Sequence, residues 1–298
     1  MPKHAQDNAL YNSQFRFWDY GTALNFESMP TIPYLATRWK IAPSGGIRGT
    51  ITKGAGPSDI AIPKWLRSQN TLQVNLTGIP AGANVTVQQH VEDASQYGQT
   101  FALLSTVHSG PMGAVIYVGV GDYLKPVTMQ GPGVPVSTTH AFMLGDFATS
   151  SMAVTVFSNP KTGGTYHVHY AQLALGLDRP RHSGFTVRTE QEDRTACNRY
   201  AYPITGGVSG PATASRLSIP LQFQNPMRAI PSLASTAATV NIVDIATGIA
   251  TAVSPPTVTA NNVTVTGCRL AVTGMTTLPA ASTQMVTSAV LGVLHADF

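Results

Sequence analysis

Two histidines separated by one residue, His167 and His169, are the first candidates for chemistry in this sequence. They lie in the stretch TYHVHYAQL (165–173), whose apolar and polar residues alternate as in a β-strand. Alternation places both imidazoles on one face and the flanking tyrosines on the other. Two imidazoles on one face can ligate a metal ion, but no third ligand is visible nearby. We therefore expect a polar pair that faces solvent, and no metal site.

Two adjacent carboxylates, Glu92 and Asp93, are the next candidates. A glycoside hydrolase needs two carboxylates about 5–10 Å apart across a cleft. Neighbouring residues at the end of a strand point to opposite sides, so this pair predicts a turn. Asp and Glu number only 14 in the chain, and no nucleophile or phosphate-binding motif is present. The sequence therefore predicts no catalytic residues, no cofactor and no enzyme.

Aromatic side chains are concentrated in YNSQFRFWDYG (11–21), where five of eleven residues are rings. Read as a strand, this stretch places Phe15 and Phe17 on one face and Gln14, Arg16 and Trp18 on the other. Rings on both faces indicate a strand that is covered on both sides, with Trp39 nearby in the sequence. We expect these rings to belong to the core, and a sugar-stacking platform is the alternative.

Three other tyrosines, Tyr97, Tyr117 and Tyr123, stand beside glycines in expected loops. Exposed rings of this kind are candidates for contact with glycans. The alternative is that they pack against neighbouring strands or subunits.

The composition indicates a globular protein with an unusual surface. Charged residues make up only 11% of the 298 residues, hydrophobic residues 43%, and the net charge is +4. Few charges are typical of a chain that gives part of its surface to neighbouring subunits. No Lys/Arg run exceeds two residues, which argues against nucleic-acid binding.

Strands dominate the expected structure. Alternating or apolar runs occur at 71–76, 84–91, 114–121, 152–158 and 165–173, and the last strand is expected in QMVTSAVLGVLHADF. Glycine and proline together make up 48 residues and divide these runs with turns. The pattern predicts an all-β protein built as an antiparallel sandwich or barrel.

One helix is expected, in RTEQEDRTACNRYAYP (188–203). Thr189 and Glu192 fit a capping box, in which each side chain binds a backbone N–H of the first turn. Glu190 and Asp193 complement the positive end of the helix dipole, and Pro203 would stop the helix. The following residues, 204–215, are typical of a flexible linker.

Cys197 and Cys268 show no metal-binding spacing, and we expect two buried free thiols rather than a disulfide. The first ten residues do not form a signal peptide, and no run approaches the roughly 18 apolar residues that cross a membrane. The chain is therefore expected to be made in the cytoplasm and to have no membrane partner.

The order of several motifs resembles a family of tailed-bacteriophage fibre and head-fibre proteins. The resemblance rests on NSQFRFWDYGTA with YLATRWKIAP, VQQHVEDASQYGQTFALLSTV, YHVHYAQLALG, FTVRTEQEDRTACNRYAYP and PMRAIPSL. These stretches run in the family's order over nearly the whole chain. The sequence departs from the family pattern at Thr37, where Asp is usual, and at Ala174, where Glu is usual. A carboxylate role at either position is not expected.

The first residues read as a loose N-terminal arm at 1–10. The resemblance implies a jelly roll like a carbohydrate-binding module at 11–184, a helical linker at 185–203 and a smaller C-terminal β-sandwich at 204–298. It implies a non-enzymatic structural protein on the virion surface, either a fibre or a capsid decoration protein. Expected partners are two further copies in a homotrimer, other virion proteins and host-surface polysaccharide. An isolated glycan-binding module and a polysaccharide depolymerase are the alternatives. Many jelly rolls bind calcium, but the sequence contains no identifiable ligand cluster.

Overall fold

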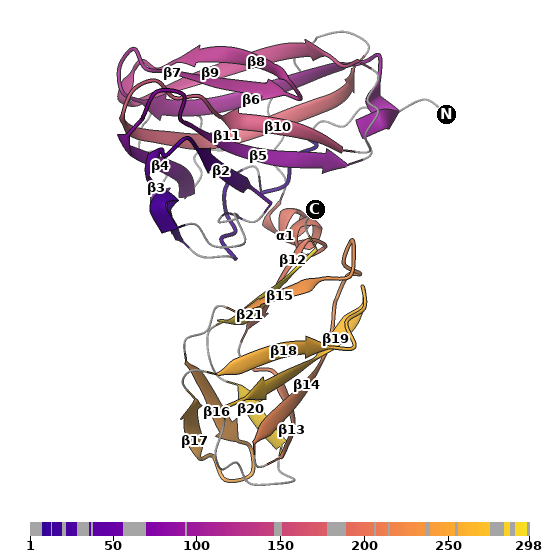
Figure 1. The fold of residues 1–298 in the computed structure, drawn as a ribbon. Helices are drawn as coiled ribbons and strands as arrows, with labels where there is room; N and C mark the ends of the chain where they lie inside the picture. Colours follow the sequence, from indigo (N-terminus) through magenta and orange to yellow (C-terminus); the bar gives the residue numbers. More distant parts are fainter. Residues whose placement is uncertain are drawn as a thin grey trace. The chain divides into compact units, whose positions relative to one another are not determined.

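Nearly all described elements are β-strands, and they fall into two units, residues 1–193 and 194–298, in this computed structural model (Figure 1). The structure describes residues 8–12, 14–19, 22–28, 36, 38–55, 70–92, 94–145, 151–177, 189–205, 207–213, 215–235, 239–253, 256–274, 283–286 and 290–296. In this part of the chain, no helix is long and apolar enough to span a membrane.

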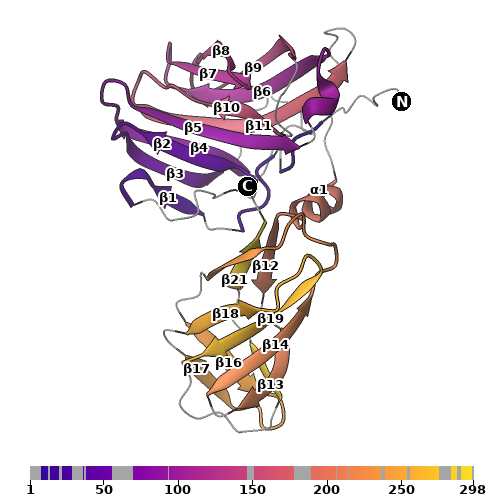
Figure 2. The ribbon, with the colours of Figure 1, turned by 45° about the vertical axis from the view of Figure 1, so that its right-hand side comes forward.

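Unit 1 is a sandwich of two antiparallel sheets, which Figures 1 and 2 show as stacked layers. The six-stranded sheet has the order β1 (Ala23–Asn25), β3 (Arg48–Ala55), β4 (Asn70–Gly78), β11 (Gly164–Leu177), β6 (Phe101–Gly110) and β9 (Gly131–Met143). The five-stranded sheet has the order β2 (Lys40–Ser44), β5 (Asn84–Glu92), β10 (Ser151–Phe157), β7 (Val115–Val120) and β8 (Tyr123–Thr128). Two 3-10 turns, η1 (Phe26–Ser28) and η3 (Ala94–Tyr97), connect strands of the sandwich. The predicted all-β jelly roll is confirmed.

Side-chain alternation explains how these strands pack. In β4, Leu72, Val74 and Leu76 are buried between the sheets, while the residues between them are partly exposed. β5 alternates in the same way over its whole length, with Val85 and Val87 in the same core. Each buried aliphatic side chain contributes about 1.5–3 kcal/mol to folding. A shift of one residue in register would move the whole apolar set to the other face.

The aromatic stretch near the start is not the strand that alternation predicts. Residues 14–18 form no sheet pairing, and both Asn12 and Phe15 have left-handed backbones, with φ of 49° and 51°. Asn12 organises the stretch: its amide donates to the Phe17 carbonyl over 2.9 Å and accepts from the Phe17 N–H over 3.0 Å. Asn tolerates this backbone conformation better than most residues do, and its side chain replaces the missing strand partner.

The expected core role of these rings is confirmed despite the different backbone. Phe15 and Phe17 are buried, and Trp18 packs partly buried against the core. The rings of Phe15 and Trp39 lie 5.2 Å apart, and the Trp39 indole donates to the Asn12 carbonyl over 3.0 Å. Tyr20, at the end of the stretch, lies outside the described residues.

The arm predicted at residues 1–10 is corrected at its C-terminal end. Asn8, Ala9 and Leu10 are buried, and the Ala9 N–H donates to the Leu173 carbonyl over 2.7 Å. β11 pairs with β4 only as far as Val168, so its later residues have backbone groups that this segment can bind. Residues 1–7 lie outside the described residues.

The predicted helix forms as α1 (Glu190–Cys197), and its capping box is confirmed. The Thr189 N–H donates to Glu192 Oε2 over 2.9 Å, and the Glu192 N–H donates to Thr189 Oγ1 over 3.3 Å. Pro203 does not end the helix. The helix ends six residues earlier in a turn, and Pro203 lies in an edge strand, where its missing N–H is tolerated.

Unit 2 contains the rest of the strands in two sheets. The three-stranded sheet has the order β12 (Ala201–Thr205), β21 (Val290–His295) and β15 (Ser232–Ser235). The seven-stranded sheet has the order β17 (Ala250–Val253), β16 (Val240–Asp244), β20 (Thr283–Val286), β13 (Ser209–Thr213), β14 (Arg216–Gln222), β19 (Gly267–Thr273) and β18 (Thr257–Asn261). The predicted smaller C-terminal β unit is confirmed.

Residues 204–215 are not the flexible linker that their composition predicts. Most of them belong to β12 and β13, and β13 pairs with both β14 and β20. Gly210 has a packing reason, because a side chain at this position would overlap the Ser218 carbonyl. Cys197 and Cys268 are buried free thiols, as predicted.

Candidate functional site

A hollow lies in unit 1 where β8 and β9 run along the same side of the sandwich. These strands are the last members of their respective sheets, and they contact each other. The hollow has a volume of about 400 Å³, which is within the usual range for small-molecule sites. Its lining combines two aromatic residues, the exposed Tyr123 and the buried Phe142, with Lys125, Gln99 and the apolar residues Met143 and Leu144.

The tight hairpin between β7 and β8 positions Tyr123. Val120 pairs directly with Tyr123, so only Gly121 and Asp122 form the turn. Gly121 has φ of 59°, a conformation that glycine adopts without strain. Tyr123 is therefore fixed at the first position of a strand while its side chain stays 66% exposed.

The opposite wall is positioned by backbone hydrogen bonds beyond the end of β9. The Gln99 N–H donates to the Leu144 carbonyl over 3.0 Å, and the Leu144 N–H donates to the Thr100 carbonyl over 2.9 Å. Gln99 has φ of 61°, and these bonds hold it in that conformation. Its side chain is exposed at the hollow.

The lining has the composition of a shallow sugar site. An exposed ring can cover the apolar C–H face of a pyranose, while an amide and an ammonium group bind hydroxyl or carboxylate groups. No carboxylate lines the hollow among the described residues, so it offers no acid–base pair for glycoside hydrolysis. The arrangement can hold a sugar chain by stacking and hydrogen bonds.

The other two tyrosines of the sequence prediction lie elsewhere. Tyr97 is only 4% exposed, at the end of η3, so for this residue the packing alternative holds and it is not a candidate for glycan contact. Tyr117 is half-buried in β7, and its backbone binds Ser158 through the Tyr117 N–H and carbonyl. The sequence could have distinguished the half-buried Tyr117 from the exposed Tyr123, because Tyr117 lies inside an apolar run, whereas Tyr123 follows a glycine turn.

The predicted solvent-facing pair of histidines is wrong for His169. This residue is 3% exposed, and its ring stacks parallel to that of half-buried His167 with centroids 5.7 Å apart. His169 Nε2 bonds to Ser109 Oγ over 2.9 Å, and His167 Nδ1 bonds to Thr71 Oγ1 over 3.2 Å. Burial, and to a smaller extent the neighbouring histidines, lowers the pKa of His169 to about 3.

No group of three His, Cys, Asp or Glu side chains in the described residues is arranged to hold a metal ion. Glu92 is the last residue of β5, and the 3-10 turn η3 begins two residues later. Asp93, its predicted partner in a turn, lies outside the described residues.

Sequence reasoning missed a buried histidine, His108, in β6. A register shift in β10 leaves Val156 as an extra residue between Thr155 and Phe157, and its carbonyl accepts a 2.7 Å hydrogen bond from His108 Nε2 across the sandwich. Burial lowers the pKa of His108 to about 4, although the bond to Val156 opposes this shift. The alternation of Ala102, Leu104, Thr106 and His108 on the core face of β6 is the signal that could have identified it.

No protein-family model matches the chain, and no curated protein sequence matches it either. Among solved structures, the enzymatically active domain of bacteriophage CBA120 tailspike protein 4 aligns with 56% of the chain at 12% identity and a TM-score of 0.38, and the chain spans 21% of that structure. A Stig cyclase from Fischerella sp. TAU aligns with 58% of the chain at 14% identity and a TM-score of 0.40, over 98% of its own length. The carbohydrate-binding module TmCBM61, solved with β-1,4-galactotriose, aligns with 56% of the chain at 12% identity and a TM-score of 0.29, over 98% of its length.

Proposed function

We propose that this protein is a non-enzymatic structural protein of a tailed-phage virion surface that binds polysaccharide through the hollow between β8 and β9. The observation that supports binding is the exposed ring of Tyr123 opposite Gln99, with Lys125 beside it. A fixed ring with polar neighbours suits a ligand that has an apolar face and many hydroxyl groups.

The contribution of Tyr123 can be estimated from its exposure. A fully covered aromatic side chain buries about 150–250 Å². Tyr123 is 66% exposed, so a sugar on one face of its ring would bury roughly 70 Å² more of it. At about 25 cal/mol per Å², this area contributes about 2 kcal/mol, or roughly a twentyfold change in affinity.

A glycan array with the full chain is the test, and titration of the strongest ligand then gives the affinity. Tyr123→Ala is expected to weaken binding roughly twentyfold, while Tyr123→Phe keeps the ring and most of the affinity. Met112→Ala, which removes another exposed apolar side chain outside the hollow, is the matched control. An array without ligands, or equal affinity for Tyr123→Ala and the natural chain, would contradict the proposal.

The virion part of the proposal is supported by the order of the sequence motifs and by the low content of charged residues. Labelled antibody on purified virions tests it, and label at the capsid or at the tail distinguishes a decoration protein from a fibre. Absence of label from the particles would refute a virion location. Light scattering tests the proposed homotrimer, which a monomeric mass would exclude.

The non-enzymatic part is tested on the polysaccharide that the array identifies. We expect no release of reducing ends during prolonged incubation. Release that disappears when a single Asp or Glu is replaced would instead identify a depolymerase.

A further inference from the structure

The part of unit 2 that follows residue 203 has an unusual charge distribution. Residues 204–298 contain Arg216, Arg228, Arg269, Asp244 and Asp297, and they contain no Lys or Glu. Asp244 is buried, and its carboxylate accepts hydrogen bonds from the N–H groups of the following turn. Its negative charge therefore lies inside the fold rather than on the surface.

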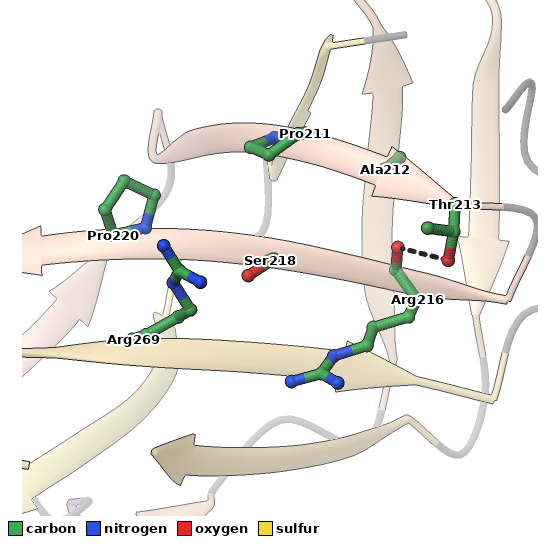
Figure 3. Close-up of a pocket in the computed structure, with 7 residues that line it drawn as sticks. All are labelled: Pro211, Ala212, Thr213, Arg216, Ser218, Pro220 and Arg269. Atoms are coloured by element: carbon green, nitrogen blue, oxygen red, sulfur yellow. Dashed lines mark hydrogen bonds between the residues drawn. The ribbon is translucent and has the colours of Figure 1, made fainter. Parts of the chain in front are cut away.

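Two of the arginines lie on one face of the seven-stranded sheet. In β14, Leu217 and Ile219 are in the core, so Arg216 and Ser218 face outward. Arg269 faces outward from the adjacent strand β19, where it pairs with Pro220, while Arg216 pairs with Thr273. Four residues along β19 thus separate the two positions, a distance of about 13 Å. Figure 3 shows both guanidinium groups on the same side of the sheet, with Ser218 between them.

The surface between the arginines is hollowed. The hollow has a volume of about 270 Å³, and Pro211 and Pro220 form part of its wall. Both arginine side chains are exposed, and neither has an ion pair among the described residues. Guanidinium groups bind carboxylate and sulfate oxygens through paired N–H donors, so this surface can bind anions.

We propose that this face of unit 2 binds an acidic polysaccharide, one that bears carboxylate or sulfate groups. An exposed ion pair contributes little alone, so two arginines at positions four residues apart along the paired strands favour a ligand with repeated anions over a single ion. A sugar polymer fits better than a nucleic acid, because the described lining has no aromatic ring on which a base could stack. Proline edges and the Ser218 hydroxyl instead suit sugar rings and their hydroxyl groups. The site does not depend on the hollow of unit 1.

Titration of the full chain with oligogalacturonate and dextran sulfate tests the site and shows whether it binds carboxylate or sulfate groups. Methyl-esterified oligogalacturonate and plain dextran are the neutral controls. The double variant Arg216→Gln/Arg269→Gln is expected to bind the preferred acidic ligand about tenfold more weakly. The variant Arg48→Gln/Lys53→Gln loses the same charge from exposed positions on β3 of unit 1 and is expected to bind normally.

Several results would overturn the proposal. These are failure of the natural chain to bind either acidic polymer, equal binding of the neutral controls, and equal weakening by the variant in β3. Tighter binding of a single-stranded oligonucleotide than of both acidic polymers would assign the face to nucleic acid instead. Circular dichroism of each variant confirms that a loss of binding is not a loss of folding.

Discussion

The buried histidine of β6 predicts that unit 1 loses stability in mild acid. His108 donates from Nε2 to the Val156 carbonyl, so in the neutral ring Nδ1 has no hydrogen. Nδ1 is buried and has no hydrogen-bond partner. A proton there would create a buried cation without an acceptor, and this explains why the pKa falls from 6.5 to about 4.

The direction of the pH dependence follows from the protonation of His108 in the folded and the unfolded chain. The unfolded chain protonates this histidine as the pH falls through 6.5, whereas the folded chain resists protonation until about pH 4. The contribution of His108 to the free energy of unfolding is therefore highest above pH 6.5, decreases between these values, and levels off below about pH 4. Between pH 7.5 and 4.5, His108 alone should account for a loss of about 2–3 kcal/mol.

Urea unfolding followed by tryptophan fluorescence measures this loss in unit 1, because all three tryptophans lie in residues 1–193. The natural chain and His108→Gln are compared at pH 7.5 and 4.5, and contributions from other groups, including His169, largely cancel in the difference. The glutamine amide can donate to the Val156 carbonyl but does not titrate. We expect the variant to lose about 2–3 kcal/mol less than the natural chain does. Equal losses in the two proteins would refute the reasoning.

Three further predictions concern the fold. Asn12→Ala should destabilise unit 1 by about 2–4 kcal/mol in urea unfolding, because it removes two hydrogen bonds to the backbone of Phe17 and places Ala at positive φ. Asn12→Gly removes only the strain and should recover about 1 kcal/mol of this. Thr189→Ala should cost α1 about 1 kcal/mol, seen as roughly fivefold faster hydrogen exchange in its first turn, and Thr189→Asp should restore protection. Cys197 and Cys268 should react with a thiol reagent only after denaturation, because both are buried and burial raises the pKa of Cys268 to about 11; rapid reaction of the native chain would contradict this.

The strands of the sandwich could be predicted because their pattern has a direct physical cause. β4 and β5 bury one face and expose the other, so the alternation of apolar and polar residues in the sequence matches the alternation of buried and exposed side chains in the structure. The capping box of α1 was equally accessible, because its two side chains are three residues apart and act locally.

The errors arose where contacts that alternation and composition do not encode decide the local structure. Residues 14–18 alternate like a strand, but the Asn12 side chain binds their backbone and no neighbouring strand pairs with them. His169 was expected to face solvent, yet it lies at a register shift in β11 and is buried with Ser109 on β6 as its partner. The composition around β13 predicted a flexible linker, and this was wrong because the glycine of β13 allows a close contact between strands.

The site was partly accessible from the sequence. Tyr123 could be proposed from a ring beside a glycine turn, but the same rule also selected the buried Tyr97. Gln99 and Leu144 are 45 residues apart in the sequence, and the pairing of β6 with β9, continued by the backbone hydrogen bond between these two residues, brings the opposite wall together. Local patterns contain no information about such a pairing.

A structure of the full chain with the strongest array ligand tests the proposed binding role most directly. The account predicts a sugar ring stacked on Tyr123, with hydroxyl groups within hydrogen-bond distance of the Gln99 amide. A ligand bound on another face of unit 1, with Tyr123 left uncovered, would contradict it.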